Sequence, residues 1–197
     1  MSGIAGYGPR RRHLLRAALA IPLAALAGPR GAAAQGLAAV NHCARATPAS
    51  SEGPFFKAGS PQRASLLAPG DQGVKLSLTG VVRGRACEPV QGALLDFWHA
   101  DLNGHYDTAG FTLRGHQFTD AAGRYRLETV VPARYPGRTR HIHVKLQRPG
   151  GSLLTTELYF PDEASNRADR QFTDALLIDL TSRTSDREDG TFDFVLA

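Results

Sequence analysis

Short runs in which apolar and polar side chains alternate recur along the chain from residue 75 onward. In the first of them Leu76, Leu78 and Val82 alternate with polar partners. A period of two places the apolar side chains on one face of a β-strand. Gly, Pro, Asn and Asp, which favour turns, close the runs. The strands expected from this pattern cover residues 75–84, 92–100, 124–131, 140–147, 153–160, 175–182 and 190–197.

The spacing of these runs predicts an all-β fold, because several short strands separated by turn signals are typical of a sandwich or barrel. Only residues 161–172 have a helical pattern, and that stretch is short. Residues 35–73 are rich in Ala, Ser, Pro and Gly and keep no period, which predicts an irregular N-terminal arm or loop. We therefore expect a single β-sandwich of about seven to nine short strands over residues 74–197, with that arm and one short helix.

The first 34 residues have the organisation of an export signal. A basic stretch at residues 10–16 precedes an apolar run from Ala17 to Ala27, and Ala32–Ala34 supply small residues suited to cleavage. The apolar run is far shorter than the roughly 20 residues that span a bilayer. The segment RRHLLR resembles a twin-arginine signal, although arginine pairs also occur in ordinary secretory signals. We expect export to the periplasm or the exterior, by the twin-arginine route.

Loss of this segment would change the charge of the chain. The whole chain carries 23 Lys and Arg against 18 Asp and Glu, and five of the arginines but none of the acidic residues lie in the first 34 positions. The mature chain would keep 18 of each sign and be formally neutral. A neutral chain gives no argument for binding nucleic acid or an anionic surface, so we expect neither a nucleic-acid partner nor stable membrane insertion.

Cys43 and Cys87 are the only two cysteines. Oxidation is permitted in an exported protein, and an even count favours pairing. A bridge would close a loop of about 44 residues, tie the arm to the sheet and contribute about 2–4 kcal/mol. Two separately buried thiols are the alternative.

Two histidines, His141 and His143, lie one residue apart in the segment RYPGRTRHIHVK. In a strand they project from the same face, where two imidazoles can hold a metal ion. A solvated strand face is also compatible with such a pair taken alone. Tyr135 and Arg138 lie in the same segment, so phenol, guanidinium and imidazole groups are gathered within nine residues.

A second cluster is the segment FWHADLNGHYD, where a strand ends in an Asn103–Gly104 turn directly before Tyr106. Loops at strand ends are where a rigid sheet presents functional groups. Taken alone, Tyr106 would more commonly seal the edge of the sheet, and Trp98 would belong to the core. Three further histidines lie nearby and have no recognised zinc-ligand spacing: His99, His105 and His116.

Together the two clusters resemble the intradiol ring-cleavage dioxygenases, the non-haem iron family that includes protocatechuate 3,4-dioxygenase. The resemblance covers residues 47–197. It rests on four segments: EGPFF (52–56), GALLDFWHADLNGHYD (92–107), GRYRLETVVPARYPGRTRHIHVKL (123–146) and TTELYFPDE (155–163).

The resemblance implies a ferric ion held by Tyr106, Tyr135, His141 and His143, with a hydroxide or water as fifth ligand. Donor chemistry agrees, because two phenolates are hard anionic donors that favour Fe(III) over Fe(II). In the family pattern Tyr106 and His141 are equatorial ligands, and Tyr135 and His143 are axial. The resemblance further implies that a catechol binds through both oxygens and displaces the hydroxide and Tyr135, which between them take up the two substrate protons.

By the same resemblance, O2 then breaks the bond between the two hydroxylated carbons and gives a muconate-type diacid. Arg138 would contact the substrate and stabilise the developing negative charge. Its alternative is a surface ion pair. Glu157 departs from the family, in which glutamine often occupies this position; it would perturb local pKa values, favour particular substrates or face solvent.

The arm is too short to hold the helical dimerisation region of catechol 1,2-type members, and all four ligand positions occur in one chain. The chain therefore resembles a minimal exported member. The catechol it cleaves and its oligomeric state stay open, with a homodimer through the arm as one option. The alternatives are a non-catalytic, transthyretin-like binding module and, less favoured, a zinc hydrolase that uses the histidine pair.

Overall fold

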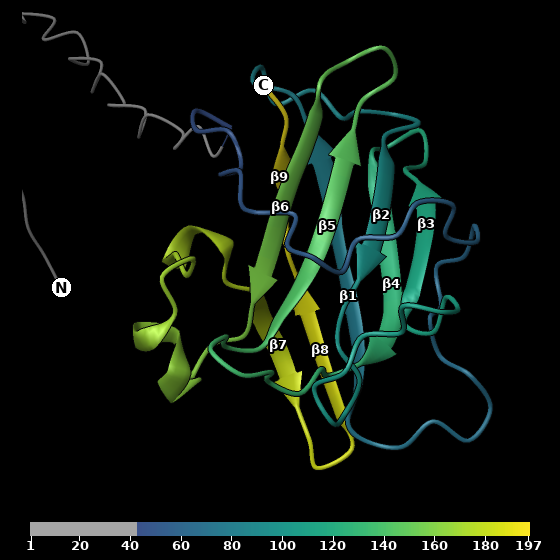
Figure 1. Ribbon diagram of the computed structural model, residues 1–197. Coiled ribbons are helices and arrows are strands. Elements are labelled where there is room, and N and C mark those ends of the chain that lie inside the picture. Colours follow the sequence, from purple (N-terminus) through teal and green to yellow (C-terminus); the bar gives the residue numbers. More distant parts are fainter. Residues whose placement is uncertain (1–42) are drawn as a thin grey trace, which may run out of the picture. The chain divides into compact units, whose positions relative to one another are not determined.

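The computed structural model describes residues 43–197, in which two β-sheets lie one behind the other (Figure 1). The strands are β1 (Lys75–Arg83), β2 (Leu94–Trp98), β3 (Arg114–Phe118), β4 (Arg124–Val130), β5 (His141–Gln147), β6 (Leu153–Tyr159), β7 (Asp179–Arg183), β8 (Arg187–Thr191) and β9 (Phe194–Val195). Two 3-10 helices, η1 (Ala164–Ala168) and η2 (Asp174–Leu176), separate β6 from β7. Neither has the length or hydropathy of a membrane-spanning helix, and no other helix occurs in residues 43–197. The expected export signal lies outside the described residues.

One sheet has the strand order β4-β1-β8-β7, with β9 also pairing with β1. The other has the order β3-β2-β5-β6, and all of its pairs are antiparallel. Strand β1 pairs in parallel with β8 and β9, so the C-terminal strands return beside the first one. The expected all-β sandwich is confirmed.

Alternation along β5 shows how the sheet separates its two faces. Ile142, Val144 and Leu146 are fully buried and belong to the hydrophobic core between the sheets. Because successive strand residues point to opposite faces, His141 and His143 lie on the outer face of the four-stranded sheet. Apolar burial on one face thus fixes where the histidines point.

The arm covers that outer face and the sheet edges. The segment after Cys43 crosses the four-stranded sheet (Figure 1), where the Ser50 amide donates to the Thr155 carbonyl at 2.9 Å. Further on, Gln62 bridges to His116 of β3 and Ser65 to Glu128 of β4, so the arm joins one edge of each sheet. Covered edges leave fewer unpaired backbone groups for aggregation.

Cys43 and Cys87 form a disulfide, with Cα atoms 5.4 Å apart, which confirms the preferred pairing. The bridge ties the start of the described arm to the loop after β1. The alternative of two separate thiols is wrong.

Some expected elements differ from the observed ones. The pattern missed β3, whose sequence RGHQF has little apolar alternation, because its pairing with β2 rather than its own pattern makes it a strand. Residues 175–182 contain the end of η2 and the start of β7. The Thr173 side chain caps the start of η2 by accepting from the Ala175 amide. Residues 190–197 divide between β8 and β9, and the expected helix at 161–172 contains only the 3-10 turn η1.

Candidate metal centre

The site is built on the first residues of β5. His141 and His143 are 3 % and 1 % exposed, and their Nε2 atoms lie 3.1 Å apart. The expected metal-binding arrangement of two imidazoles on one strand face is therefore present, and the alternative of a solvated strand face is wrong.

Tyr106 reaches the same point from the loop after β2, with its hydroxyl 3.2 Å from His141 Nε2. Asp101 shapes this loop, because its Oδ1 accepts from the amides of Asn103 and His105, each at 2.8 Å. Gly104 has a φ of +80°, and a Cβ there would lie 2.5 Å from the carbonyl oxygen of Arg134. Glycine at this position lets the loop that carries Tyr106 pack against the loop that carries Tyr135.

Tyr135 lies beside the rings of Tyr106 and His141. Its ring centroid is 5.8 Å from that of Tyr106 and 5.6 Å from that of His141. A turn closed by the Arg138 amide donating to the Tyr135 carbonyl at 3.0 Å presents it between β4 and β5. The structure thus gathers all four predicted ligand side chains on the outer face of one sheet.

The protonation of these side chains fits a bound cation. His141 Nδ1 lies 2.7 Å from the Thr139 carbonyl oxygen, which can only accept, so Nδ1 carries the proton and Nε2 has a free lone pair. Burial lowers the pKa of His141 and lowers that of His143 well below its ordinary value, which favours the neutral, ligating form.

Burial, with smaller contributions from Tyr135 and Glu157, raises the pKa of Tyr106 above its usual range. Its phenol therefore keeps its proton until a cation compensates the phenolate. Two imidazole lone pairs and two phenol oxygens form a donor set suited to a hard trivalent metal ion.

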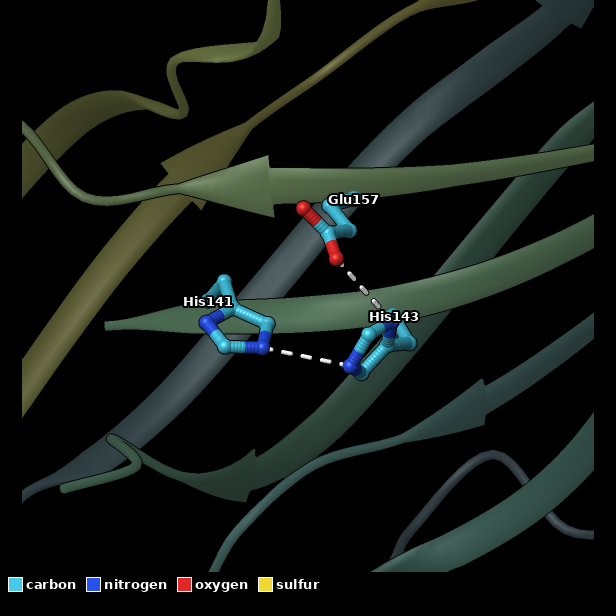
Figure 2. A group of neighbouring side chains, drawn as sticks. All are labelled: His141, His143 and Glu157. Atoms are coloured by element: carbon cyan, nitrogen blue, oxygen red, sulfur yellow. Dashed lines mark hydrogen bonds and ion pairs between the residues drawn. The ribbon is translucent and has the colours of Figure 1, made fainter. Parts of the chain in front are cut away.

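Glu157 is fully buried on β6, opposite His143 in the β5–β6 register. Its Oε1 lies 3.3 Å from His143 Nδ1. Figure 2 marks this contact with a dashed line. Among residues 43–197, His141, His143 and Glu157 form the one group of three His, Cys, Asp or Glu side chains close enough to hold a metal ion. The interpretation in which Glu157 faces solvent is wrong.

Arg138 lies beside this group and is bound by two carboxylates. Its Nη2 donates to Glu157 Oε2 at 2.7 Å, and its Nε donates to Asp169 Oδ2 at 2.8 Å. Burial lowers the pKa of Arg138, but the hydrogen bonds and charges of Glu157 and Asp169 outweigh burial and raise it overall. With its side chain 10 % exposed, Arg138 does not form the surface ion pair considered as its alternative.

Aromatic side chains that the sequence did not single out as site residues enclose the centre. Phe55, from the arm, stacks on Tyr106 with centroids 4.4 Å apart and meets Tyr135 edge-on at 5.9 Å. Trp98 stacks on His143. The sequence signal that could have identified Phe55 as a site residue was its place in the EGPFF segment. The contact of Trp98 with His143 could be found only from the strand register.

The remaining histidines near the tyrosine motif do not join the centre. His99 is buried, with its ring nitrogens 2.8 Å from the Ala100 carbonyl oxygen and 2.7 Å from Thr129 Oγ1. His116 Nδ1 lies 2.7 Å from the Ser60 carbonyl oxygen. These contacts are structural, and neither His99, His105 nor His116 belongs to a group of described residues close enough to hold a metal ion.

Comparisons with known proteins agree with this geometry. A family model described as "Dioxygenase" matches residues 51–197. Catechol 1,2-dioxygenase 2 of Acinetobacter lwoffii is 33% identical over 138 residues, covering 57% of this chain and 50% of the relative. The chain spans about half the length of the curated relatives that it matches first.

Among solved structures, the dioxygenase domain of a dioxygenase carbohydrate-binding protein fusion from Streptomyces sp. SirexAA-E is 55% identical, with a TM-score of 0.75, and the match covers 77% of this chain and 98% of that one. The 3-chlorocatechol 1,2-dioxygenase of Rhodococcus opacus 1CP is 25% identical, with a TM-score of 0.69 and coverage of 75% and 71%. The sandwich, the gathered tyrosines and histidines and these matches lead to one conclusion: the chain belongs to the intradiol ring-cleavage dioxygenase family.

Proposed function

We propose that this protein is a non-haem Fe(III) intradiol dioxygenase that uses O2 to cleave the bond between the two hydroxylated carbons of a catechol. The observation that carries the proposal is the meeting of Tyr106 and His143 at the free Nε2 of His141, with the ring of Tyr135 alongside. Relatives named catechol and chlorocatechol 1,2-dioxygenases support this reaction class.

In this proposal Tyr106, Tyr135, His141 and His143 hold the iron. Bound Fe(III) would act as a Lewis acid and redox partner that makes the catechol reactive toward O2. Tyr135 also lines a cavity of about 730 Å³, whose lining does not include Tyr106, His141 or His143. Tyr135 would be a phenolate when it holds the iron, and we assign to that oxygen the uptake of one proton from an arriving catechol.

Arg138 lines the same cavity. Its guanidinium is held in place by Glu157 and Asp169, so it can offer a fixed positive group to a substrate that becomes negatively charged. Phe55 stacks on Tyr106 and Trp98 stacks on His143, so each shields one ligand ring from water, which strengthens electrostatic interactions within the site.

The absorption spectrum and the iron content of purified protein test this proposal. Tyrosinate bound to Fe(III) gives a visible charge-transfer band, so the protein should be red to burgundy and should consume O2 when catechol is added. Tyr106→Phe and His141→Ala should lose iron, and Tyr135→Phe should keep iron with a weaker, shifted band and slower turnover. Normal iron content and colour in all three variants would contradict the assignment. A transthyretin-like binding module or a zinc hydrolase would be colourless.

The substrate is proposed only as a class. Oxygen uptake measured on a panel of catechol, chlorocatechols, hydroxyquinol and carboxylated catechols will identify the preferred member. Export would favour phenols that are met outside the cytoplasm, such as those derived from plant material or lignin.

We also propose export by the twin-arginine route, on the basis of the RRHLLR segment and the disulfide that an oxidising compartment would maintain. The N-terminal sequence of protein recovered outside the cytoplasm tests the expected cleavage near residue 34. A homodimer stays a prediction, which sedimentation of the purified protein will check.

A further inference from the structure

A row of outward-facing side chains crosses all four strands of the β3-β2-β5-β6 sheet. The register pairs Arg114 with Trp98, Trp98 with His143, and His143 with Glu157. All four side chains are buried. His143 therefore has an aromatic neighbour on one side and a carboxylate on the other, and each neighbour restrains the imidazole differently.

Trp98 restrains the plane of the His143 ring, because the two rings are parallel to within 2°. Stacking on Trp98 does not favour one ring orientation over the other that a half-turn about the Cβ–Cγ bond of His143 produces. That half-turn keeps the ring plane and exchanges the positions of Nε2 and Cε1. Polar neighbours of the ring nitrogens distinguish the two orientations: His141 lies near Nε2, and a second polar group is needed near Nδ1.

Glu157 supplies that neighbour. Its Oε1 and His143 Nδ1 lie 3.3 Å apart, an ion-pair contact slightly longer than an ordinary hydrogen bond. Both atoms are buried, and neither has a hydrogen-bond partner among the described residues. Since buried polar atoms rarely stay unpaired, a small rotation of the carboxylate would complete the bond.

The other carboxylate oxygen of Glu157 is held by two hydrogen bonds. Glu157 Oε2 accepts from the Arg138 guanidinium at 2.7 Å and from the Tyr159 hydroxyl. Arg138 is anchored in turn by Asp169, whose Oδ2 also accepts from the Thr139 amide at 2.9 Å. A chain of buried polar contacts thus runs from the loop after η1 to the imidazole of His143.

The position of Glu157 also argues against a role as a metal ligand. Its near oxygen faces Nδ1 of His143, whereas Nε2 of the same ring faces His141, as Figure 2 shows. The other oxygen is occupied by Arg138 and Tyr159. Glu157 therefore lies behind His143 relative to the point where the two Nε2 atoms meet.

We propose that Glu157 is a positioning residue, which accepts the Nδ1 proton of His143 and so holds the Nε2 lone pair toward the metal centre. This inference rests on the proposed function, because it presumes that the centre binds iron. A buried carboxylate behind a ligating histidine fixes its tautomer and raises its donor strength. Glutamine cannot replace both contacts, since its amide offers one acceptor and one donor, and the donor would face Arg138 or His143.

Glu157→Gln is the main variant, and Glu188→Gln is its matched control. Glu188 lies on β8, in the other sheet, and is 8 % exposed. Its Oε1 lies 3.0 Å from Arg183 Nε. Chelator competition should show a ten- to hundred-fold loss of iron affinity in Glu157→Gln, roughly the effect of removing such a partner elsewhere. The visible band should also shift, whereas Glu188→Gln should keep the affinity and the band of the wild type.

A second measurement needs no iron, and its wild-type part needs no variant. In the metal-free wild type, long-range 1H–15N NMR should show the His143 proton on Nδ1, and in Glu157→Gln a part of it should move to Nε2. A wild-type proton on Nε2, or an iron affinity in Glu157→Gln within twofold of wild type, would overturn the inference. Failure of the proposed function is a separate outcome: a wild type that binds no iron and consumes no O2 with any catechol.

Discussion

Trp98 lies flat against His143, with ring centroids 4.8 Å apart and 2° between the ring planes. The two residues are direct partners in the β2–β5 ladder. Trp98 is 1 % exposed although it points to the outer face of the sheet, because the arm covers it through Phe56. The tryptophan expected to belong to the core is thus buried against the candidate metal centre.

We expect Trp98→Ala to lower the free energy of unfolding by about 3–5 kcal/mol and to weaken iron binding, because the imidazole loses the surface that fixes its plane. Denaturant unfolding of the metal-free protein and chelator competition measure the two effects. Phe194→Ala, which truncates a fully buried aromatic residue on β9, should lower stability without changing iron affinity. Equal iron affinity in wild type and Trp98→Ala would show that stacking does not position His143.

The arm should protect the centre from solvent through Phe55, which contacts the rings of both Tyr106 and Tyr135. We expect Phe55→Ala to release iron to a chelator several-fold faster than wild type, followed as loss of the visible band, because water gains access to the ligand oxygens. Phe118→Ala is the control, since Phe118 is 50 % exposed. Identical release from the Phe55 variant and wild type would contradict this role.

The disulfide should stabilise the fold by restricting the unfolded chain. It closes a loop with a sequence separation of 44, for which chain entropy predicts about 4 kcal/mol. The double variant Cys43→Ser, Cys87→Ser should therefore unfold at a lower denaturant concentration than the oxidised wild type. Wild-type protein whose disulfide has been reduced should unfold at the same lower concentration. If both unfold at the midpoint of the oxidised protein, the bridge contributes nothing.

His99 should make the metal-free protein less stable in acid. Burial lowers the pKa of His99 to about 4, below the ordinary value near 6.5. Between these values the unfolded chain binds more protons than the folded one. The stability that depends on neutral His99 is thus complete above about pH 6.5 and is lost as the pH falls toward about 4.

Between pH 7 and about pH 4.5, wild type should lose about 2 kcal/mol more than His99→Gln, which keeps a polar group near Thr129 but does not titrate. Unfolding free energies of both proteins at the two pH values check this. Parallel losses would mean that other groups control the acid response.

The pattern along the chain predicted most of the strands, because alternation is a local property of each segment. It missed β3, whose residues Arg114, His116 and Phe118 on the outer face give no apolar period. That segment becomes a strand because β2 and the arm supply its hydrogen-bond partners on both sides. Pairing of this kind is a long-range property that local periodicity does not contain.

The candidate site likewise has features that follow from local sequence and features that depend on contacts between distant segments. The spacing of His141 and His143 placed both on one face, since that follows from strand geometry alone. Tyr106 and Tyr135 were assigned to the centre by resemblance, and the geometric reason for their meeting is the approach of Gly104 to the carbonyl of Arg134.

By itself, then, the sequence determined the β-sandwich and the pair of histidines on one strand face, because both depend on the alternation of neighbouring side chains. Only the tertiary structure decided that Trp98 and Glu157 flank His143 and that the arm covers Trp98 through Phe56. Periodicity states which face a side chain occupies. Which side chain stands next to it depends on strand order and register, which form only when distant segments pair.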